Sequence, residues 1–256
     1  MAEVPLKVWR ERDGHLARLR LSRPKANIID AAMTAALDGA FAGAAGEAPL
    51  RGVLLDAEGP NFSFGASVEE HLPATVAAML QALHALLLRM LAFPVPILVA
   101  VRGQCLGGGL EVATAGHLLF AAPESRLGQP EVQVGVFPPA ASCLLPERIG
   151  RAAAEDLLFS GRSIDGREAL RLGLASAVAD DPEGAALAYF DEYLGKRSAA
   201  VLRHGVAAAR ADLVERVRSK LRDAEQRYLG GLMKTRDALE GLEAFMQKRP
   251  ARWEDR

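Results

Sequence analysis

The strongest constraint in the sequence is a junction at residues 95–116, where an apolar run, a cluster of glycines and a helical pattern follow one another. The run PILVAV is typical of a buried strand, and QCLGGGLEVA places three consecutive glycines directly before the helical pattern. Glycine allows close approach of the backbone but is costly to order. The junction therefore predicts a strand, a tight turn and a helix whose first amides are open to a ligand. A turn needed only for packing is the alternative.

Strands alternate with helices over the first two thirds of the chain. A hairpin is predicted at 6–21 around Asp13-Gly14, and a helix at 31–45 with Asp30 as its N-cap. Further strands are expected at 51–57, 95–102 and 118–122, and further helices near 75–92 and 108–116. Residues 123–142 are predicted as a loop, followed by short helices to 178 and a helical region from about 184. This alternation predicts an α/β fold.

Composition excludes several classes of function. The chain has 256 residues with 31 basic and 32 acidic side chains, so no bulk charge attracts nucleic acid. Cys105 and Cys143 form no CxxC pair, and the five histidines are scattered, so we predict no metal site and interpret each histidine as a surface or internally satisfied residue. The N-terminus lacks a signal-peptide pattern, and charges and prolines interrupt the apolar segment 76–101, which predicts a cytoplasmic protein without a membrane span. The GxGxxG, GxxxxGK[ST] and GxSxG motifs are absent.

Two carboxylates give the glycine junction a chemical interpretation. Glu111 lies one turn into the predicted helix among apolar residues, and Glu131 follows in LGQPEVQVG. A carboxyl group in apolar surroundings has a pKa raised toward neutrality, where it serves as a general acid or base. Amides at the helix start are suited to holding a developing oxyanion. Exposed helix residues are the alternative for such glutamates.

At this level of detail the chain resembles the crotonase superfamily, the enoyl-CoA hydratase/isomerase family. The resemblance rests on the segments LSRPKANIID, FSFGASVEEH, AVRGQCLGGGLEVATAGHLLFAAPESRLGQPEVQVGVFP, RIGRAAAEDLLFSGRSIDGREALRLGLASAV and EGLEAFMQKR. It implies an α/β spiral core of ββα turns over residues 1–195 and a helical C-terminal region over 196–256 used in trimerisation. It also implies a homotrimer or hexamer, an acyl-CoA thioester substrate and no cofactor, because coenzyme A is part of the substrate.

The resemblance also assigns roles to individual residues. It implies that the amides of Ala66 and Gly108 form an oxyanion hole, and that Glu111 and Glu131 are catalytic, with acid and base interchangeable at this stage. Phe245 and Lys248 fall in the C-terminal helix, which in this family tends to reach a neighbouring subunit's coenzyme A. The remaining implied substrate-binding residues are Lys25, which falls where relatives contact coenzyme A phosphates or adenine, and Ala26, Phe64, Gly65, Ser67, Gly107 and Pro139.

The sequence departs from the common family pattern at two places. Ser67 stands where many members have aspartate, and Pro139 stands where many hydratases have glycine. Since proline lacks an N–H, we expect a donor near Glu131 to be missing and the pocket there to be reshaped.

The segments RPKANIID and VFPPAASCLLPERIG most resemble the branch that hydrates cyclic dienoyl-CoA thioesters in anaerobic aromatic degradation. This implies a hydro-lyase that converts cyclohexa-1,5-diene-1-carbonyl-CoA to 6-hydroxycyclohex-1-ene-1-carbonyl-CoA through a dienolate. A straight-chain enoyl-CoA hydratase or an enoyl-CoA isomerase is the alternative, and a non-catalytic RNA-binding or assembly subunit is a more remote one. The presence of two glutamates favours hydration, which needs two separate proton transfers.

Overall fold

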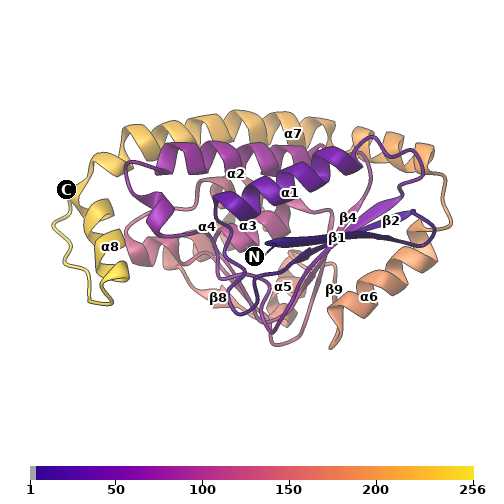
Figure 1. Ribbon diagram of the computed structural model, residues 1–256. Coiled ribbons are helices and arrows are strands. Elements are labelled where there is room, and N and C mark those ends of the chain that lie inside the picture. Colours follow the sequence, from indigo (N-terminus) through magenta and orange to yellow (C-terminus); the bar gives the residue numbers. More distant parts are fainter. Residues whose placement is uncertain (1–3) are drawn as a thin grey trace.

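A computed structural model describes residues 4–256 as an α/β core with two sheets, covered by helices (Figure 1). The larger sheet has the strand order β1-β2-β3-β4-β6-β9, and the smaller sheet has the order β5-β7-β8. The predicted fold class is confirmed; residues 1–3 of the predicted 1–195 unit lie outside the described residues. The strands are β1 Leu6–Glu11, β2 Leu16–Leu21, β3 Gly52–Ala57, β4 Ile97–Val101, β5 Gln104–Leu106, β6 Leu118–Ala121, β7 Arg126–Gly128, β8 Ser163–Ile164 and β9 Ala177–Val178.

The helices occupy the faces and one end of this core. The longer ones are α1 Ala31–Ala44, α2 Val76–Leu91, α3 Gly108–Ala115, α4 Pro139–Ser160, α5 Gly166–Leu172, α6 Pro182–Tyr189, α7 Ala199–Gly230 and α8 Arg236–Met246. Short 3-10 or π turns are η1 Glu69–His71, η2 Pro130–Val134, η3 Phe190–Leu194 and η4 Leu232–Lys234. Helix α7 lies along α2 and also packs against α4 (Figure 1). Within residues 4–256, the helices are too short or too polar to cross a membrane.

A repeated unit of two strands and a helix builds the centre of the molecule. In β4-β5-α3 and again in β6-β7-α4, the first strand joins the larger sheet and the second joins the smaller sheet. Strand β4 pairs in parallel with β6, and β5 pairs in parallel with β7. The ββα spiral that the resemblance implied is therefore present. Stacking the units brings the starts of α3 and η2 to the same side, because both follow a strand of the smaller sheet.

Local predictions at the N-terminal end are confirmed. The chain turns between β1 and β2 with Asp13 and Gly14 at positive φ, which the short polar side chain and the missing Cβ tolerate. The Asp30 carboxylate accepts from the Met33 amide at 2.9 Å and caps α1. The segment 123–142 differs from the predicted loop, since it contains β7 and η2 and the first residues of α4. A three-residue strand is too short to show alternation; pairing with β5 defines it.

Two arginines hold the C-terminal end of α3. Arg148 donates to the carbonyl oxygens of Thr114, Gly116 and His117, and Arg210 of α7 donates to those of Ala115 and Gly116. Burial lowers the pKa of Arg210 to about 10, and the Arg148 charge adds to this effect. Helix C-termini carry unpaired carbonyls and partial negative charge, so both guanidinium groups complement that end. The C-terminal helical region is thereby tied to the core helix that carries Glu111.

We expect Arg210→Ala to lower the free energy of unfolding by roughly 2–3 kcal/mol, because it removes the charged donor of the buried Ala115 carbonyl and one of the two guanidinium donors of the Gly116 carbonyl. Urea unfolding followed by circular dichroism measures this change. Arg218→Ala on an exposed face of the same helix is the control, and we expect a change of about 0.5 kcal/mol or less. Equal decreases in the free energy of unfolding for the two variants would show that the hydrogen bonds from Arg210 to α3 do not stabilise the fold.

Candidate active site

Close backbone contact defines the start of α3. Gly107 has φ +49°, and a Cβ built on it would lie 2.5 Å from Oε1 of Glu131. A Cβ on Gly109 would lie 2.5 Å from the Cβ of Ser63. Side chains at these positions would therefore displace the carboxylate or the neighbouring loop. The predicted strand, glycine turn and helix are present, and the close approach involves catalytic candidates as well as packing.

Two amides with free N–H groups lie side by side at this turn. The loop bearing Ala66 is held by Ser63, which bonds along β5: its amide donates to Gln104 and its carbonyl accepts from Leu106. A Cβ on Gly108 would lie 3.2 Å from the amide nitrogen of Ala66. Among residues 4–256, neither the Ala66 amide nor the Gly108 amide donates to a protein acceptor. The first amides of a helix have no acceptor within it, which leaves the pair available to a carbonyl oxygen of a ligand.

Glu111 is buried beneath this turn with amide donors as its partners. Its side chain is 4 % exposed and Oε1 accepts from the Ala141 amide at 2.8 Å, with the Ala140 amide also contributing. Burial raises the pKa of Glu111 to about 7, while the two amides act in the opposite direction. Pro139 is the first residue of α4, where a missing N–H costs no hydrogen bond. We expected Pro139 to remove a hydrogen-bond donor near Glu131. The amides that follow Pro139 instead face Glu111.

Glu131 comes from η2, directly after β7. Burial raises the pKa of Glu131 to about 8, and the charge of Glu111 adds to the rise. Gln129 is fully buried, and with its amide nitrogen turned toward the carboxylate it donates to both oxygens at 3.1 Å. Both carboxyl groups therefore hold protons more tightly than exposed glutamates, because Glu111 is buried and Glu131 is only partly exposed, toward the cavity. Groups with a pKa near 7 exchange protons efficiently at neutral pH.

A cavity of about 270 Å³ opens in front of Glu131. The lining includes five predicted site residues besides Glu131, together with His71, Leu242 and several other apolar side chains. The predicted lining residues are Phe64, Gly65, Ala66, Gly107 and Phe245. Phe245 is 55 % exposed and lines this cavity from α8 of the same chain. Helix α8 thus covers the cavity of its own chain. The implied contact with a neighbouring subunit's coenzyme A stays a prediction.

The other predicted residues lie around this cavity. Lys25 is exposed in the loop before α1, and the carbonyl of Ala26 accepts from the amide of Phe64 at 2.9 Å. Ser67 lies beside the cavity and its carbonyl accepts from Nδ1 of His71 at 2.7 Å. Lys248 is exposed just after α8, with φ +54°. Ala66 and Glu131 belong to the cavity lining. Gly108 and Glu111 do not, but Gly108 contacts Ala66, and the charge of Glu111 acts on Glu131. The other predicted residues outside the lining are Lys25, Ala26, Ser67, Pro139 and Lys248.

Sequence reasoning missed two residues of the site. His71 was interpreted as a surface or satisfied side chain, yet it lines the cavity, and burial lowers its pKa. Its Nδ1 must carry hydrogen to reach the Ser67 carbonyl, so in the neutral ring Nε2 is an acceptor. Gln129 was not singled out. The one available signal was position, because His71 follows Ala66 in the same loop and Gln129 precedes Glu131 by two residues.

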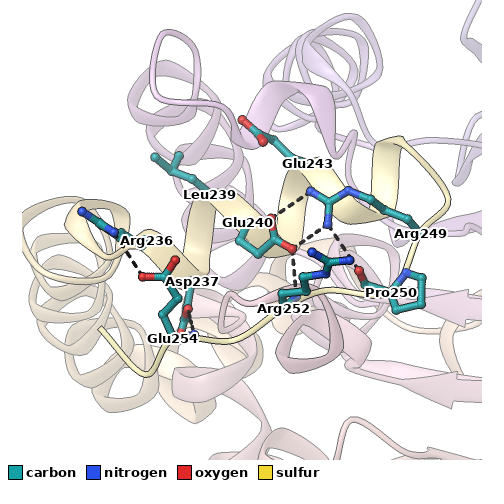
Figure 2. Close-up of a pocket in the computed structure, with 9 residues that line it drawn as sticks. All are labelled: Arg236, Asp237, Leu239, Glu240, Glu243, Arg249, Pro250, Arg252 and Glu254. Carbon is teal, nitrogen blue, oxygen red and sulfur yellow. Dashed lines mark hydrogen bonds and ion pairs between the residues drawn. The ribbon is translucent and has the colours of Figure 1, made fainter.

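A larger hollow of about 690 Å³ lies between α8 and the C-terminal tail (Figure 2). Four of its charged groups form two ion pairs: Arg249 with Glu240 at 2.6 Å, and Arg236 with Glu254 at 3.1 Å. Asp237 accepts from the amides of Glu254 and Asp255. These pairs fasten the tail to α8, and the hollow contains neither carboxylate of raised pKa. The smaller cavity is therefore the candidate active site.

Comparison with known proteins agrees with this geometry. The family model described as enoyl-CoA hydratase/isomerase matches residues 11–256. A Thauera aromatica protein named cyclohexa-1,5-dienecarbonyl-CoA hydratase is 62% identical over 255 residues, which cover 100% of this chain and 99% of that protein. The structure of an enoyl-CoA hydratase/isomerase from Pseudoalteromonas atlantica T6c has a TM-score of 0.84 at 26% identity, over 97% of this chain and 99% of that one. An enoyl-CoA hydratase from Mycobacterium avium subsp. paratuberculosis K-10 gives a TM-score of 0.86 at 23% identity, with 98% and 99% coverage.

The pKa of Glu131 predicts how its replacement affects stability. Between the ordinary value of 4.5 and the folded value of about 8, the unfolded carboxyl ionises while the folded one stays protonated. The native state therefore loses stability as pH rises through this range. At the acidic end of this pH range we expect Glu131→Gln to melt at the same temperature as wild type. As the pH rises through the range, we expect its melting temperature to exceed that of wild type by a growing amount.

Thermal unfolding at a series of pH values measures this difference. Glu155→Gln, the same chemical change at an exposed position of α4, is the matched control for loss of a carboxyl group outside the cavity. A difference between Glu131→Gln and wild type that does not change with pH would contradict a raised pKa of Glu131.

Proposed function

The chain belongs to the enoyl-CoA hydratase/isomerase family, and we propose that it adds water to the cyclic thioester cyclohexa-1,5-diene-1-carbonyl-CoA. The product is 6-hydroxycyclohex-1-ene-1-carbonyl-CoA. The observation that carries the proposal is the pair of carboxyl groups with raised pKa beside two free amides. The full-length similarity to the Thauera hydratase supports the choice of acyl group.

The amides of Ala66 and Gly108 receive the thioester oxygen. Both N–H groups are free, and Gly108 is the first residue of α3, so the helix dipole adds positive potential at the same point. Negative charge develops on this oxygen when a nucleophile attacks the conjugated system. Donors fixed in advance stabilise that charge without reorganising, which is where such sites gain most of their rate.

Glu111 acts as base and Glu131 as acid in the proposed cycle. Glu111 takes one proton of the water as the oxygen attacks the β-carbon, and a dienolate forms. Glu131 then delivers its proton to the far end of the dienolate, which leaves one double bond in conjugation with the thioester. The water oxygen and its remaining hydrogen become the ring hydroxyl. Proton exchange between the two carboxyl groups and solvent restores the starting state, and no cofactor is needed.

The environments of the two carboxyl groups support this order of roles. Glu111 accepts hydrogen bonds from the amides that begin α4, which favours its ionised form. Glu131 has the higher pKa because it feels the charge of an ionised Glu111. One carboxylate and one carboxylic acid is therefore the favoured state near neutral pH, as conjugate hydration requires.

We propose that the chain forms a homotrimer or hexamer through its C-terminal region, residues 196–256. The family resemblance supports this, and α7 leaves apolar side chains such as Val201 exposed. Size-exclusion chromatography with light scattering gives the mass directly. Three or six times 27.3 kDa is expected, and a single 27.3 kDa species at assay concentrations would contradict the proposal.

The first test of function is a side-by-side assay on cyclohexa-1,5-diene-1-carbonyl-CoA and crotonyl-CoA. We expect mass spectrometry to show the gain of one water on the cyclic diene, at a kcat/KM well above that for crotonyl-CoA. Hydration of crotonyl-CoA alone would rule out the cyclic substrate and leave a straight-chain hydratase. Absence of reaction with both would direct attention to double-bond isomerisation.

The pH dependence follows from the two pKa values. Activity should rise as Glu111 ionises around pH 7 and fall as Glu131 loses its proton around pH 8, so kcat/KM should be bell-shaped with a narrow top. Initial rates at pH values from about 5 to 10 check this. A rate that is flat across that range would remove both glutamates from the proton transfers.

Replacement of Gly108 tests the oxyanion hole. A side chain there starts 3.2 Å from both the Cβ and the amide nitrogen of Ala66, so Gly108→Val should crowd the thioester oxygen. We expect kcat to fall about 100-fold or more with the fold retained. Gly43→Ala on α1, where an added Cβ meets nothing within 4 Å, is the control and should keep full activity. Unchanged turnover of Gly108→Val would contradict the assignment.

A further inference from the structure

Tyr228 presents a buried polar atom for which the folded chain offers no partner. The residue lies near the C-terminal end of α7 and is 0 % exposed. Among residues 4–256, its hydroxyl has no hydrogen-bond partner. A buried hydroxyl without a partner is destabilising, and phenylalanine would fill the same space without that cost. The hydroxyl therefore requires an explanation outside the protein's own packing.

The surroundings of Tyr228 place it behind the wall of the active-site cavity. Its ring packs in an apolar cluster with Val136 and Leu242, and both of these residues line the cavity. The ring of Phe137 meets it edge-on, with centroids 5.2 Å apart. Val136 is also fixed to the turn of Glu131, whose carbonyl accepts from the Val136 amide at 3.2 Å. Tyr228 therefore belongs to the same local unit as the proposed acid.

The charged groups around Tyr228 agree with its position next to the cavity wall. Burial raises the pKa of Tyr228 above its ordinary value, and the charges of Glu131 and then Glu111 raise it further. The phenol therefore stays protonated across the working range. It is thus suited to exchange hydrogen bonds with a neutral hydroxyl or a water molecule, and unsuited to act as a base.

We propose that the Tyr228 hydroxyl binds the water molecule that is added to the substrate and, after the reaction, the ring hydroxyl of the product. The inference rests on the proposed function and deepens it. A water that donates one hydrogen to Glu111 and the other to the Tyr228 oxygen has its lone pair free to face the β-carbon. Double-bond isomerisation needs no such site, so Tyr228 favours hydration among the reactions open to two carboxyl groups.

Tyr228→Phe tests the proposal because it removes the hydroxyl alone. We expect kcat for hydration of cyclohexa-1,5-diene-1-carbonyl-CoA to fall about tenfold or more, with KM changed by no more than about twofold, since before the reaction the hydroxyl contacts the water and not the acyl-CoA substrate. The melting temperature should be equal to or higher than that of wild type, because an unpaired buried group is lost. Tyr189→Phe, on α6, is the matched control and should keep the wild-type kcat.

The outcomes separate the inference from the proposed function. A wild-type enzyme that fails to hydrate the cyclic diene overturns both. Wild-type activity with an equally active Tyr228→Phe variant overturns the inference alone. A lower melting temperature for Tyr228→Phe would show that the hydroxyl has a structural partner and would also overturn it. A crystal structure with bound product should place the ring hydroxyl within hydrogen-bond distance of the Tyr228 oxygen; a product hydroxyl elsewhere would contradict the proposal.

Discussion

Two carboxyl groups lie in one site in which neutral dipoles are their close partners, and this constraint organises the rest of the structure. Glu111 is held by the first amides of α4, and Glu131 is held by the Gln129 amide. A guanidinium at either position would lower both pKa values and remove the proton that hydration needs. The buried cations Arg148 and Arg210 are instead at the opposite end of α3. Helix α3 therefore has two arginines at its C-terminal end and the carboxyl group of Glu111 in its first turn, and both arrangements agree with the helix dipole.

Absence of side chains is as important here as their presence. Gly107 and Gly109 let the Glu131 carboxylate and the Ser63 loop come close to the start of α3. A third close approach joins α8 to η2, where a Cβ on Gly241 would lie 2.4 Å from the carbonyl oxygen of Val134. Through it, α8 packs directly on the turn that bears Glu131. The cavity is thus small because backbones meet on several sides.

The sequence predicted those parts of the site that depend on local pattern. The hairpin, the capped α1, the strand-glycine-helix junction and Glu111 follow from periodicity and glycine chemistry. Glu131 was a proton-transfer candidate from its apolar neighbours, whereas the role of the Ala66 amide came from the family resemblance. Tertiary packing supplied the rest. Tyr228 packs against the cavity-lining residues Val136 and Leu242 from a helix almost a hundred residues beyond Glu131, and nothing in its own segment marks it. A lone histidine such as His71 has the same sequence appearance whether it lines a cavity or the surface. Strand β7 is defined by its partner, so periodicity had no chance to find it.

The bonds from Arg210 to the end of α3 have a consequence for how the protein opens. Helix α7 contributes both this tether and Tyr228, and η4 links it to α8, which covers the cavity. Proteins open in cooperative units whose free energies differ, and terminal helices tend to belong to the weaker ones. If the C-terminal helices detach as one such cooperative unit, α3 loses its hydrogen bonds to Arg210 and the cavity loses the residues that α8 contributes to its lining, in a single step. Catalysis would then be switched off by a sub-global fluctuation while the sheets remain folded, and hydrogen exchange in α7 would track the lifetime of activity more closely than exchange in β4.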